Sequence, residues 1–280
     1  MKTLLEVKNL SVEAKSKKLS VKLVDNISFS LKEGECLGIL GESGSGKSMT
    51  CKAIMGLLDK NFQIEGSAIY ENNDLLKKNS EDMRKLRGKE IAMVLQNPMT
   101  CFDPLYPIGY QMAETFTEHL NLNQEEIKKK SIEILELMQL KNTEDILHKY
   151  PHQLSGGMLQ RIMIGLAMAM EPKLLIADEP TTAIDAVTQY EIIKEFIKIK
   201  EKYKVAIIFI SHDLSVISKI ADNVIVMSNG KAVAQGDKNY IFSSEKEEYT
   251  KMLIEKKMAV MNRYKEILHN GRRKVYAAGS

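Results

Sequence analysis

The fold of this chain is decided at residues 36–55, which read CLGILGESGSGKSMTCKAIM. Residues 36–40 are a continuous apolar run of the kind that forms a parallel strand covered on both faces. The run leads into the pattern G-x-x-x-x-G-K-[ST], whose glycines let backbone N–H groups close around phosphate oxygens. Because a helix-forming segment follows at residues 49–55, a bound phosphate would also meet the positive end of a helix dipole. The stretch therefore predicts a phosphate-binding loop in an α/β domain.

Two side chains of this loop are expected to do chemistry. Lys47 should reach the outer phosphates as a point charge, and Ser48 should offer its hydroxyl to Mg²⁺. A Gly/Ser turn of purely structural use is the weaker alternative, because the strand and the helix that the motif requires are both present. The residues predicted to bind the nucleotide are Gly41, Glu42, Ser43, Gly44, Ser45, Gly46, Lys47 and Ser48.

A second apolar run, at residues 174–177, ends in Asp178 and Glu179. Ligands of open α/β sheets bind at the carboxyl ends of strands. One of these carboxylates can hold Mg²⁺ while its neighbour faces an attacking water. An acidic pair that only caps the following helix is the alternative, and the phosphate loop at residues 41–48 makes it the weaker one.

Composition excludes several classes of protein. A chain of 280 residues fits one large α/β domain, or one domain with a subdomain. With 40 basic and 37 acidic side chains the net charge is +3, too balanced to indicate a nucleic-acid partner. Charge interrupts the N-terminus too early for a signal peptide, and no apolar run approaches the ~18 residues of a membrane span. We expect a cytoplasmic chain with no nucleic-acid partner.

The three cysteines, Cys36, Cys51 and Cys101, are odd in number and widely spaced. They contain no C-x-x-C pair, so neither a disulfide framework nor a zinc or iron–sulfur site is indicated. We expect all three to be buried structural thiols.

The apolar pattern divides the chain into a core and an inserted helical piece. Residues 5–10 and 27–31 alternate apolar and polar side chains, which predicts a small antiparallel sheet beside the main one. Between Pro98 and Pro151, helical periodicity at residues 124–138 predicts a helical subdomain. Pro98 is expected to stop regular structure there. The continuous apolar runs predicted to form the main parallel sheet are residues 36–40, 91–95, 174–177 and 205–210.

The run Leu154-Ser155-Gly156-Gly157-Met158 lies between the phosphate loop and the acidic strand end. Its hydroxyl and glycine amides open an apolar helix and form a second anion site. Kinases and small GTPases have no use for such a run at this point. In this order of motifs the chain resembles the ATP-binding cassette (ABC) family, over roughly residues 3–240.

The resemblance implies an α/β fold: a P-loop NTPase (RecA-like) core with an antiparallel β-subdomain and an inserted α-helical subdomain. We expect residues 1–97 and 162–242 to form the core with its β-subdomain, and residues 98–161 to form the helical subdomain. Residues 243–280 would form an amphipathic helical tail, which either packs back on the core or binds a partner.

The resemblance also assigns roles around ATP and Mg²⁺. Asp178 would hold the metal together with Ser48 and Gln96, and Glu179 would be the general base. Gln96 would also link the core to the helical subdomain, and His212, at another strand end, would sense the γ-phosphate. The implied catalytic residues are therefore Glu179, His212 and Gln96.

In the resembling family two cassettes face each other head to tail, and each completes the ATP pocket of the other. Ser155, Gly156, Gly157 and Met158 would contact the opposing nucleotide, and Asp185 resembles the loop that crosses to the opposing subunit. Many members have Gln at the position of Met158. Since backbone amides and Ser155 do most of the phosphate binding, we expect activity to survive this departure.

A second departure concerns the base of the nucleotide. Family members often carry an aromatic residue between the first two strands that stacks on adenine, yet residues 12–18 contain none. A preference for ATP over GTP is therefore implied by the resemblance and not by residues of this chain.

Three stretches, residues 41–48, 96–104 and 150–158, resemble the peptide/nickel importer subfamily. In that subfamily two different ATPase subunits serve two permeases and, indirectly, an extracytoplasmic solute-binding protein. Peptide-type members usually extend at the C-terminus with a cysteine cluster, whereas here no cysteine follows Cys101. The chain is thus most similar to D-type ATP-binding subunits of the nickel or metal-chelate branch. It would power uptake of that cargo from the cytoplasmic face of the cell membrane, as a heterodimer or, in isolation, a homodimer.

Three alternatives remain at this stage. The chain could serve a di- or oligopeptide importer, it could be a soluble cassette ATPase of DNA repair or translation, or it could hold ATP without hydrolysing it. The intact Glu179 and His212 argue against the last. The five histidines form no ligand array, and methionines such as Met163, Met168 and Met170 are expected to fill the core, so any metal cargo would be bound elsewhere.

Overall fold

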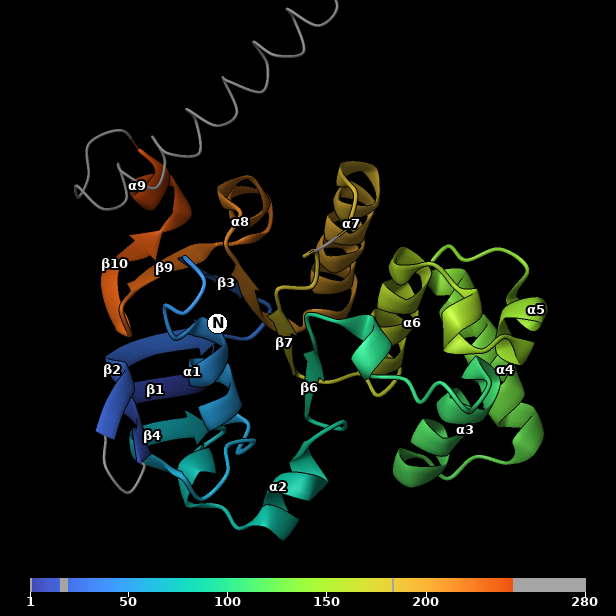
Figure 1. Cartoon of the computed structure of the whole chain (residues 1–280), viewed down its shortest axis with the longest axis horizontal. Coiled ribbons are helices and arrows are strands. Elements are labelled where there is room, and N and C mark those ends of the chain that lie inside the picture. Colours follow the sequence, from blue (N-terminus) through green and yellow to red (C-terminus); the bar gives the residue numbers. More distant parts are fainter. Residues whose placement is uncertain (1, 16–19, 183, 244–280) are drawn as a thin grey trace, which may run out of the picture.

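A computed structural model of the chain describes residues 2–15, 20–182 and 184–243. The amphipathic tail predicted for residues 243–280 lies outside the described residues from residue 244 onward. The centre of the fold is a six-stranded sheet in the order β10-β9-β3-β8-β7-β6 (Figure 1). All its neighbours pair in parallel except β10, which runs antiparallel to β9 at the edge. Its strands are β3 (Cys36–Gly41), β6 (Ile91–Val94), β7 (Leu174–Asp178), β8 (Ala206–Ser211), β9 (Asn223–Ser228) and β10 (Lys231–Asp237).

A smaller antiparallel sheet, in the order β2-β1-β4-β5, lies against one face of this sheet (Figure 1). It consists of β1 (Thr3–Lys15), β2 (Ser20–Lys32), β4 (Phe62–Tyr70) and β5 (Asn73–Asp74). Helix α1 (Lys47–Ile54) buries Cys51 and Ile54 in the same apolar cluster as side chains from both sheets. The start of α1, and with it the phosphate loop, is therefore fixed between two packed sheets.

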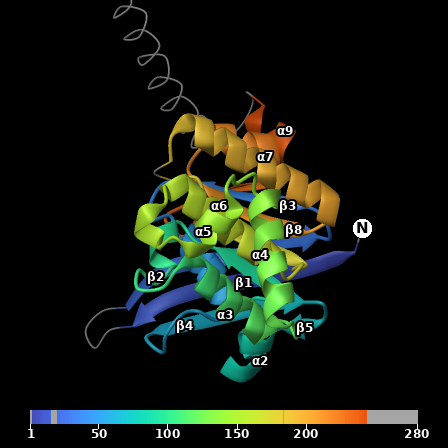
Figure 2. The same ribbon diagram turned by 90° about the vertical axis from the view of Figure 1, so that its right-hand side faces the viewer.

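The inserted helices lie beyond the β6 edge, and Figure 2 views them face on. They are η2 (Pro98–Thr100), α3 (Ile108–His119), α4 (Gln124–Leu137), α5 (Thr143–His148), η3 (Pro151–Gln153) and α6 (Gly156–Met168). Helix α6 runs across the boundary predicted at residue 161. Its glycine Gly165 allows a close approach to α4, because a Cβ there would lie 2.6 Å from Ile134 Cγ2.

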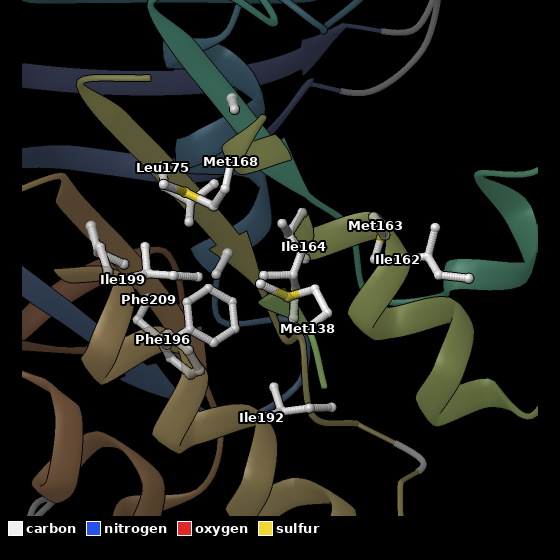
Figure 3. Packing of buried hydrophobic residues seen from close by; sticks show 14 of the residues in the cluster. Met138, Ile162, Met163, Ile164, Met168, Leu175, Ile192, Phe196, Ile199 and Phe209 are labelled. Atoms are coloured by element: carbon white, nitrogen blue, oxygen red, sulfur yellow. The ribbon is translucent and has the colours of Figure 1, made fainter. Parts of the chain in front are cut away.

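Further helices complete the layers. η1 (Leu75–Lys77) and α2 (Ser80–Leu86) follow the small sheet, whereas α7 (Ala186–Tyr203), α8 (Leu214–Ile220) and α9 (Lys238–Phe242) follow strands of the main sheet. Phe196 of α7 packs edge-on against Phe209 of β8, with ring centroids 5.2 Å apart. Figure 3 shows that this apolar cluster continues into the inserted helices through Met138, Met163 and Met168. The main sheet and the inserted helices thus share one core, and Met163 and Met168 fill it as predicted.

Two expectations drawn from the sequence were wrong. Cys36 and Cys51 are buried, but Cys101 is exposed, because it lies in the turn after η2, where its Sγ is 3.5 Å from the carbonyl oxygen of Asn97. Pro98 does not stop regular structure; it begins the short 3₁₀ helix η2, whose N-terminus is capped by the Asn97 side chain. Among the described residues, no helix combines the length and apolar character needed to cross a membrane.

Candidate active site

Residues 41–48 form a tight loop between β3 and α1, and two of its glycines are sterically required. Gly46 has φ +100°, and a Cβ on it would lie 2.7 Å from the carbonyl oxygen of Leu23. A Cβ on Gly41 would lie 2.4 Å from the carbonyl oxygen of Met227. The loop is therefore held against β2 and the end of β9 by backbone contacts that only glycine permits.

The Lys47 side chain is buried within this loop, where its ammonium donates to the carbonyl oxygens of Gly41 (2.9 Å) and Glu42 (2.8 Å). The ammonium also lies 3.6 Å from Glu179 Oε1. Burial lowers the Lys47 pKa, and the neighbouring Glu179 carboxylate opposes that shift. Ser45 Oγ is buried beside the loop and has no hydrogen-bond partner among the described residues. The Lys47 ammonium and the unpaired Ser45 hydroxyl both suit a phosphate group held by the loop.

Ser48 and Asp178 come from different elements, α1 and β7, and meet directly: Ser48 Oγ donates to Asp178 Oδ1 at 2.7 Å. Burial raises the Asp178 pKa, and the Ser48 hydrogen bond opposes that shift. A hydroxyl and a carboxylate are the hard oxygen ligands that Mg²⁺ prefers. No group of three or more His, Cys, Asp or Glu in the described ranges could hold a metal ion. A hydroxyl and a carboxylate suit Mg²⁺ because this ion usually takes its remaining ligands from water and phosphate.

Glu179 follows β7 directly and has φ +47°, a left-handed conformation that is uncommon for a residue with a side chain. Its Oε2 accepts a hydrogen bond from Thr182 Oγ1 (2.8 Å) and lies 3.2 Å from His212 Nδ1. Burial raises the Glu179 pKa, but the Thr182 hydrogen bond and the charges of His212 and Lys47 outweigh burial, so the net shift is downward. The carboxylate is thus ionised near neutral pH and fixed in direction.

Most of these groups border one cleft of about 810 Å³, whereas Asp178 lies behind its lining and is joined to it through Ser48. Its lining contains the whole loop 41–48 together with Gln96, Glu179 and His212, so the structure brings these predicted residues together. Besides Leu40 and Met49, which flank the loop and were not predicted as site residues, it contains four residues from other segments that sequence reasoning missed: Lys22, Leu23, Asn229 and Gly230. They lie on β2 and in the β9–β10 turn, where no motif marks them. The described lining contains no Phe, Tyr or Trp, which agrees with the absence of a stacking aromatic in the sequence.

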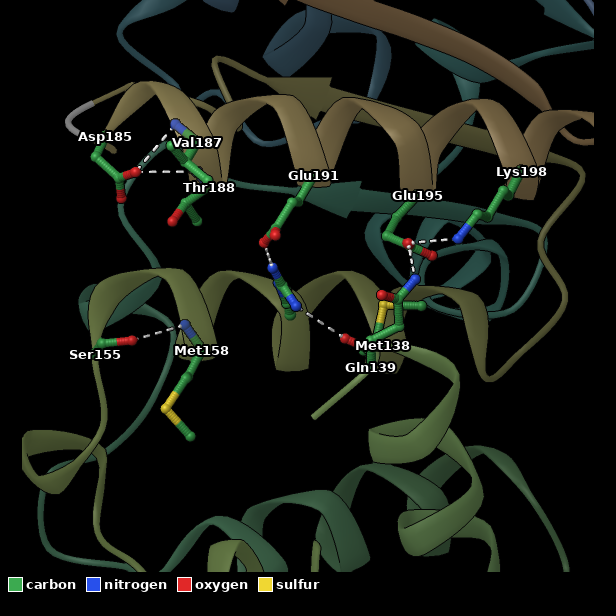
Figure 4. Close-up of polar contacts among 11 residues, drawn as sticks. Met138, Gln139, Ser155, Met158, Asp185, Val187, Thr188, Glu191, Glu195 and Lys198 are labelled. Carbon is green, nitrogen blue, oxygen red and sulfur yellow. Dashed lines mark hydrogen bonds and ion pairs between the residues drawn. The ribbon is translucent and has the colours of Figure 1, made fainter. Parts of the chain in front are cut away.

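The Ser-Gly-Gly run and Asp185 lie elsewhere, at the neighbouring N-termini of α6 and α7 (Figure 4). Ser155 Oγ caps α6 by accepting from the Met158 N–H at 3.2 Å, and Asp185 caps α7 by accepting from the Val187 and Thr188 N–H groups. Neither the Ser-Gly-Gly run nor Asp185 belongs to the lining of the cleft. The chain therefore carries two separate glycine-rich helix starts.

Comparison with known proteins fits this geometry. The family model described as ABC transporter matches residues 24–182, more than half of the chain. The chain belongs to the ABC transporter family. It is 45% identical to the metal-staphylopine import system ATP-binding protein CntD of Staphylococcus aureus, over 95% of this chain and 97% of that protein. It is 43% identical to the dipeptide transport ATP-binding protein DppD of Haemophilus influenzae, over 90% of this chain and 76% of that protein.

Solved ABC structures share the architecture. The dimeric post-hydrolysis state of the ATP-binding cassette MJ0796, bound to ADP and Pi, superposes with a TM-score of 0.75 at 26% identity, covering 84% of this chain and 99% of that one. The cbiO1 component of a Clostridium perfringens ABC transporter complex gives 0.73 at 26% identity, covering 96% of this chain and all of that one. The predicted family and fold class are confirmed. The chain is the ATP-hydrolysing subunit of an ABC importer.

Proposed function

We propose that the cleft at residues 41–48 binds ATP with Mg²⁺ and hydrolyses it with Glu179 as the general base. The observation that carries this proposal is the fixed Glu179 carboxylate, held between Thr182, His212 and Lys47 at the mouth of the phosphate loop. A base that is oriented before substrate arrives loses little free energy to reorganisation.

In this mechanism Lys47 binds the outer phosphates, and Glu179 accepts the proton of the attacking water. His212 keeps Glu179 oriented and faces the same cleft, which suits a sensor of the γ-phosphate. Ser48 and Asp178 would hold Mg²⁺, which when bound neutralises charge on the phosphate oxygens. Gln96 lines the cleft two residues after the end of β6 and would complete the metal and water contacts.

The second glycine-rich helix start is proposed to serve the nucleotide of an opposing subunit. Ser155, Gly156, Gly157 and Met158 would contact that nucleotide, and Asp185 would cross the interface. An added Cβ on Gly156 would meet no atom of the described chain within 4 Å, so this helix start is open to a partner. The dimeric MJ0796 structure supports this arrangement. The partner is a second copy or a related ATPase subunit.

An apolar groove between the core and the inserted helices suits the permease. It has a volume of about 340 Å³ and is lined mainly by aliphatic and methionine side chains. Leu57 and Leu95 in this groove are 47% and 36% exposed, so the groove presents apolar side chains to solvent. Because Gln96 follows Leu95 directly, one strand end reaches both the groove and the cleft. We infer that cytoplasmic segments of two membrane permeases dock here, which places the chain at the cytoplasmic face of the membrane.

The proposed cargo is nickel or another metal in chelated form, delivered by an extracytoplasmic binding protein. The relative named for metal-staphylopine import supports it, since the alignment covers nearly all of both chains. A peptide cargo is the second candidate, favoured by the dipeptide relative at a similar identity. Uptake of radioactive nickel with added chelator, against uptake of labelled dipeptide, in cells lacking this chain distinguishes them.

The catalytic proposal is tested with Glu179→Gln. General-base catalysis contributes about 10²- to 10⁴-fold, so turnover should fall by that factor while ATP binding persists. The variant should accumulate as an ATP-bound dimer in size-exclusion chromatography with light scattering. Glu171→Gln, an exposed glutamate outside the cleft, is the matched control. Unchanged turnover by Glu179→Gln would refute the assigned base.

A further inference from the structure

Helix α7 presents two adjoining faces to different parts of the molecule. Ile192, Phe196 and Ile199 are buried in the apolar cluster with the main sheet. Thr188, Glu191 and Glu195 follow one another at spacings of three and four, so they share a second face. Figure 4 shows this second face turned toward α6 and the end of α4. A single helix thus touches both the sheet that carries the phosphate cleft and the inserted helices that carry Ser155.

Three contacts join this second face to the inserted helices, and we name them the α7 clamp. At its start a Cβ on Gly157 would lie 2.7 Å from Thr188 Cγ2, so the starts of α6 and α7 are in close contact. One turn further, the Arg161 guanidinium pairs with Glu191 and also reaches the Met138 carbonyl oxygen at 3.5 Å. The three contacts are Gly157–Thr188, Arg161–Glu191 and Gln139–Glu195.

The third contact contains a buried charge. Glu195 is only 6% exposed, and its Oε1 accepts from Gln139 Nε2 at 2.6 Å and from Lys198 at 2.9 Å. Gln139 has φ +56° and lies just after α4, so its side chain reaches Glu195 from a turn in a strained conformation. Lys198 lies on α7 itself, so Gln139 is the partner that links this carboxylate to the inserted helices. A buried carboxylate is unfavourable unless it is paired and hydrogen-bonded.

We propose that the α7 clamp fixes the spacing between Ser155 and Asp185, so that both reach the opposing subunit together when ATP binds. Glu195 and Gln139 are then positioning residues for the second half-site, although neither borders the cleft. This inference rests on the proposed ATP-bound dimer. It predicts that loosening the clamp weakens dimerisation without weakening ATP binding to the single chain, because the phosphate loop lies in the other part of the molecule.

The test uses the full chain in a Glu179→Gln background, in which the ATP-bound dimer accumulates. The dimer dissociation constant is measured by analytical ultracentrifugation, and ATP affinity is measured at concentrations where the chain is monomeric. Glu195→Ala and Gln139→Ala should each weaken the dimer about tenfold, the scale of one contact within a coupled network. Gln139 is exposed, so its truncation leaves the core packing intact. Glu195→Gln retains an acceptor oxygen and should recover most of the loss.

Two controls separate positioning from a general loss of stability. Val12→Ala in the small sheet creates a cavity far from α7 and should lower the melting temperature without changing the dimer constant. The double variant Gln139→Ala/Glu195→Ala should be no weaker than either single variant, because both remove one contact.

The inference is overturned if Gln139→Ala and Glu195→Ala dimerise like the parent, or if Val12→Ala weakens the dimer equally at the same loss of melting temperature. If the parent Glu179→Gln chain forms no dimer with ATP, the proposed ATP-bound dimer is refuted, and the inference on the α7 clamp is refuted with it. If the parent dimerises and the clamp variants have the same dimer dissociation constant, only the inference on the α7 clamp is refuted.

Discussion

The phosphate loop and the start of α6 both place glycines ahead of a helix, yet they differ in how much of a site one chain supplies. At the phosphate loop, Lys47 lies 3.6 Å from Glu179 Oε1, Ser48 donates to Asp178 of β7, and Glu179 contacts His212, which follows β8. At the start of α6, among the residues that the structure describes, the Ser155 side chain is hydrogen-bonded only to its own helix and Gly156 faces open space. The first site has its phosphate-binding and proposed metal-binding groups assembled within a single chain, whereas the second is a surface whose use depends on a partner.

The substitution Lys47→Ala should show the largest functional difference between the phosphate loop and the start of α6. It removes the buried ammonium that would bind the outer phosphates, so ATP affinity of the single chain should fall about 100-fold, the usual scale for losing one buried charged partner. Isothermal titration with ATP measures the effect, and Lys60→Ala, an exposed lysine outside the cleft, is the control. Equal affinities for the two variants would contradict the assignment of the cleft.

The substitutions Gly46→Ala and Gly156→Ala should differ in their effect on the stability of the fold. Gly46→Ala places a side chain at φ +100° against the Leu23 carbonyl oxygen, and we expect it to destabilise the fold by about 1–3 kcal/mol. Gly156→Ala meets open space and should change stability by less than about 0.5 kcal/mol while still reducing turnover through the dimer. Urea unfolding followed by circular dichroism measures both free energies. A larger loss of stability for Gly156→Ala than for Gly46→Ala would contradict the distinction drawn between the two glycines.

A more modest effect is expected at two helix caps. Ser155→Ala removes the acceptor for the Met158 N–H, and Asn79→Ala removes the equivalent acceptor for Asp82 at the start of α2. Each should cost about 1 kcal/mol of stability. Only Ser155→Ala should also weaken the ATP-bound dimer of the Glu179→Gln chain. Equal dimer constants for the two cap variants would show that Ser155 serves α6 alone.

Motifs with fixed spacing could be predicted from the sequence because the chemistry of each is contained in a few consecutive residues. The loop at 41–48, the Asp178-Glu179 pair and the strand before His212 all lie where their patterns placed them. Their convergence on one cleft follows from strand order, since β3, β7 and β8 are neighbours in one parallel sheet.

Contacts between distant segments could not be predicted in this way. Leu23 and Asn229 reach the cleft only because β2 and the β9–β10 turn pack against the loop glycines. Gln139 lies in the turn after α4, which no sequence pattern marked. Glu195 lies in a helix, where charged side chains usually face solvent, and the sequence did not indicate that it is buried. Cys101 was misjudged because the apolar character of a thiol says little about a turn that lies on the surface.

The left-handed backbone conformation of Glu179 brings the stability of the fold into conflict with the proposed turnover at one position. A glutamate held at φ +47° makes the native state less favourable, while glycine or asparagine would adopt that conformation readily. Glu71 and Glu171 adopt the same conformation outside the cleft, so the strain alone does not mark a functional position. In the proposed mechanism, a substitution that relieved the strain at Glu179 would also remove the general base, so greater stability at this position would be gained at the cost of hydrolysis.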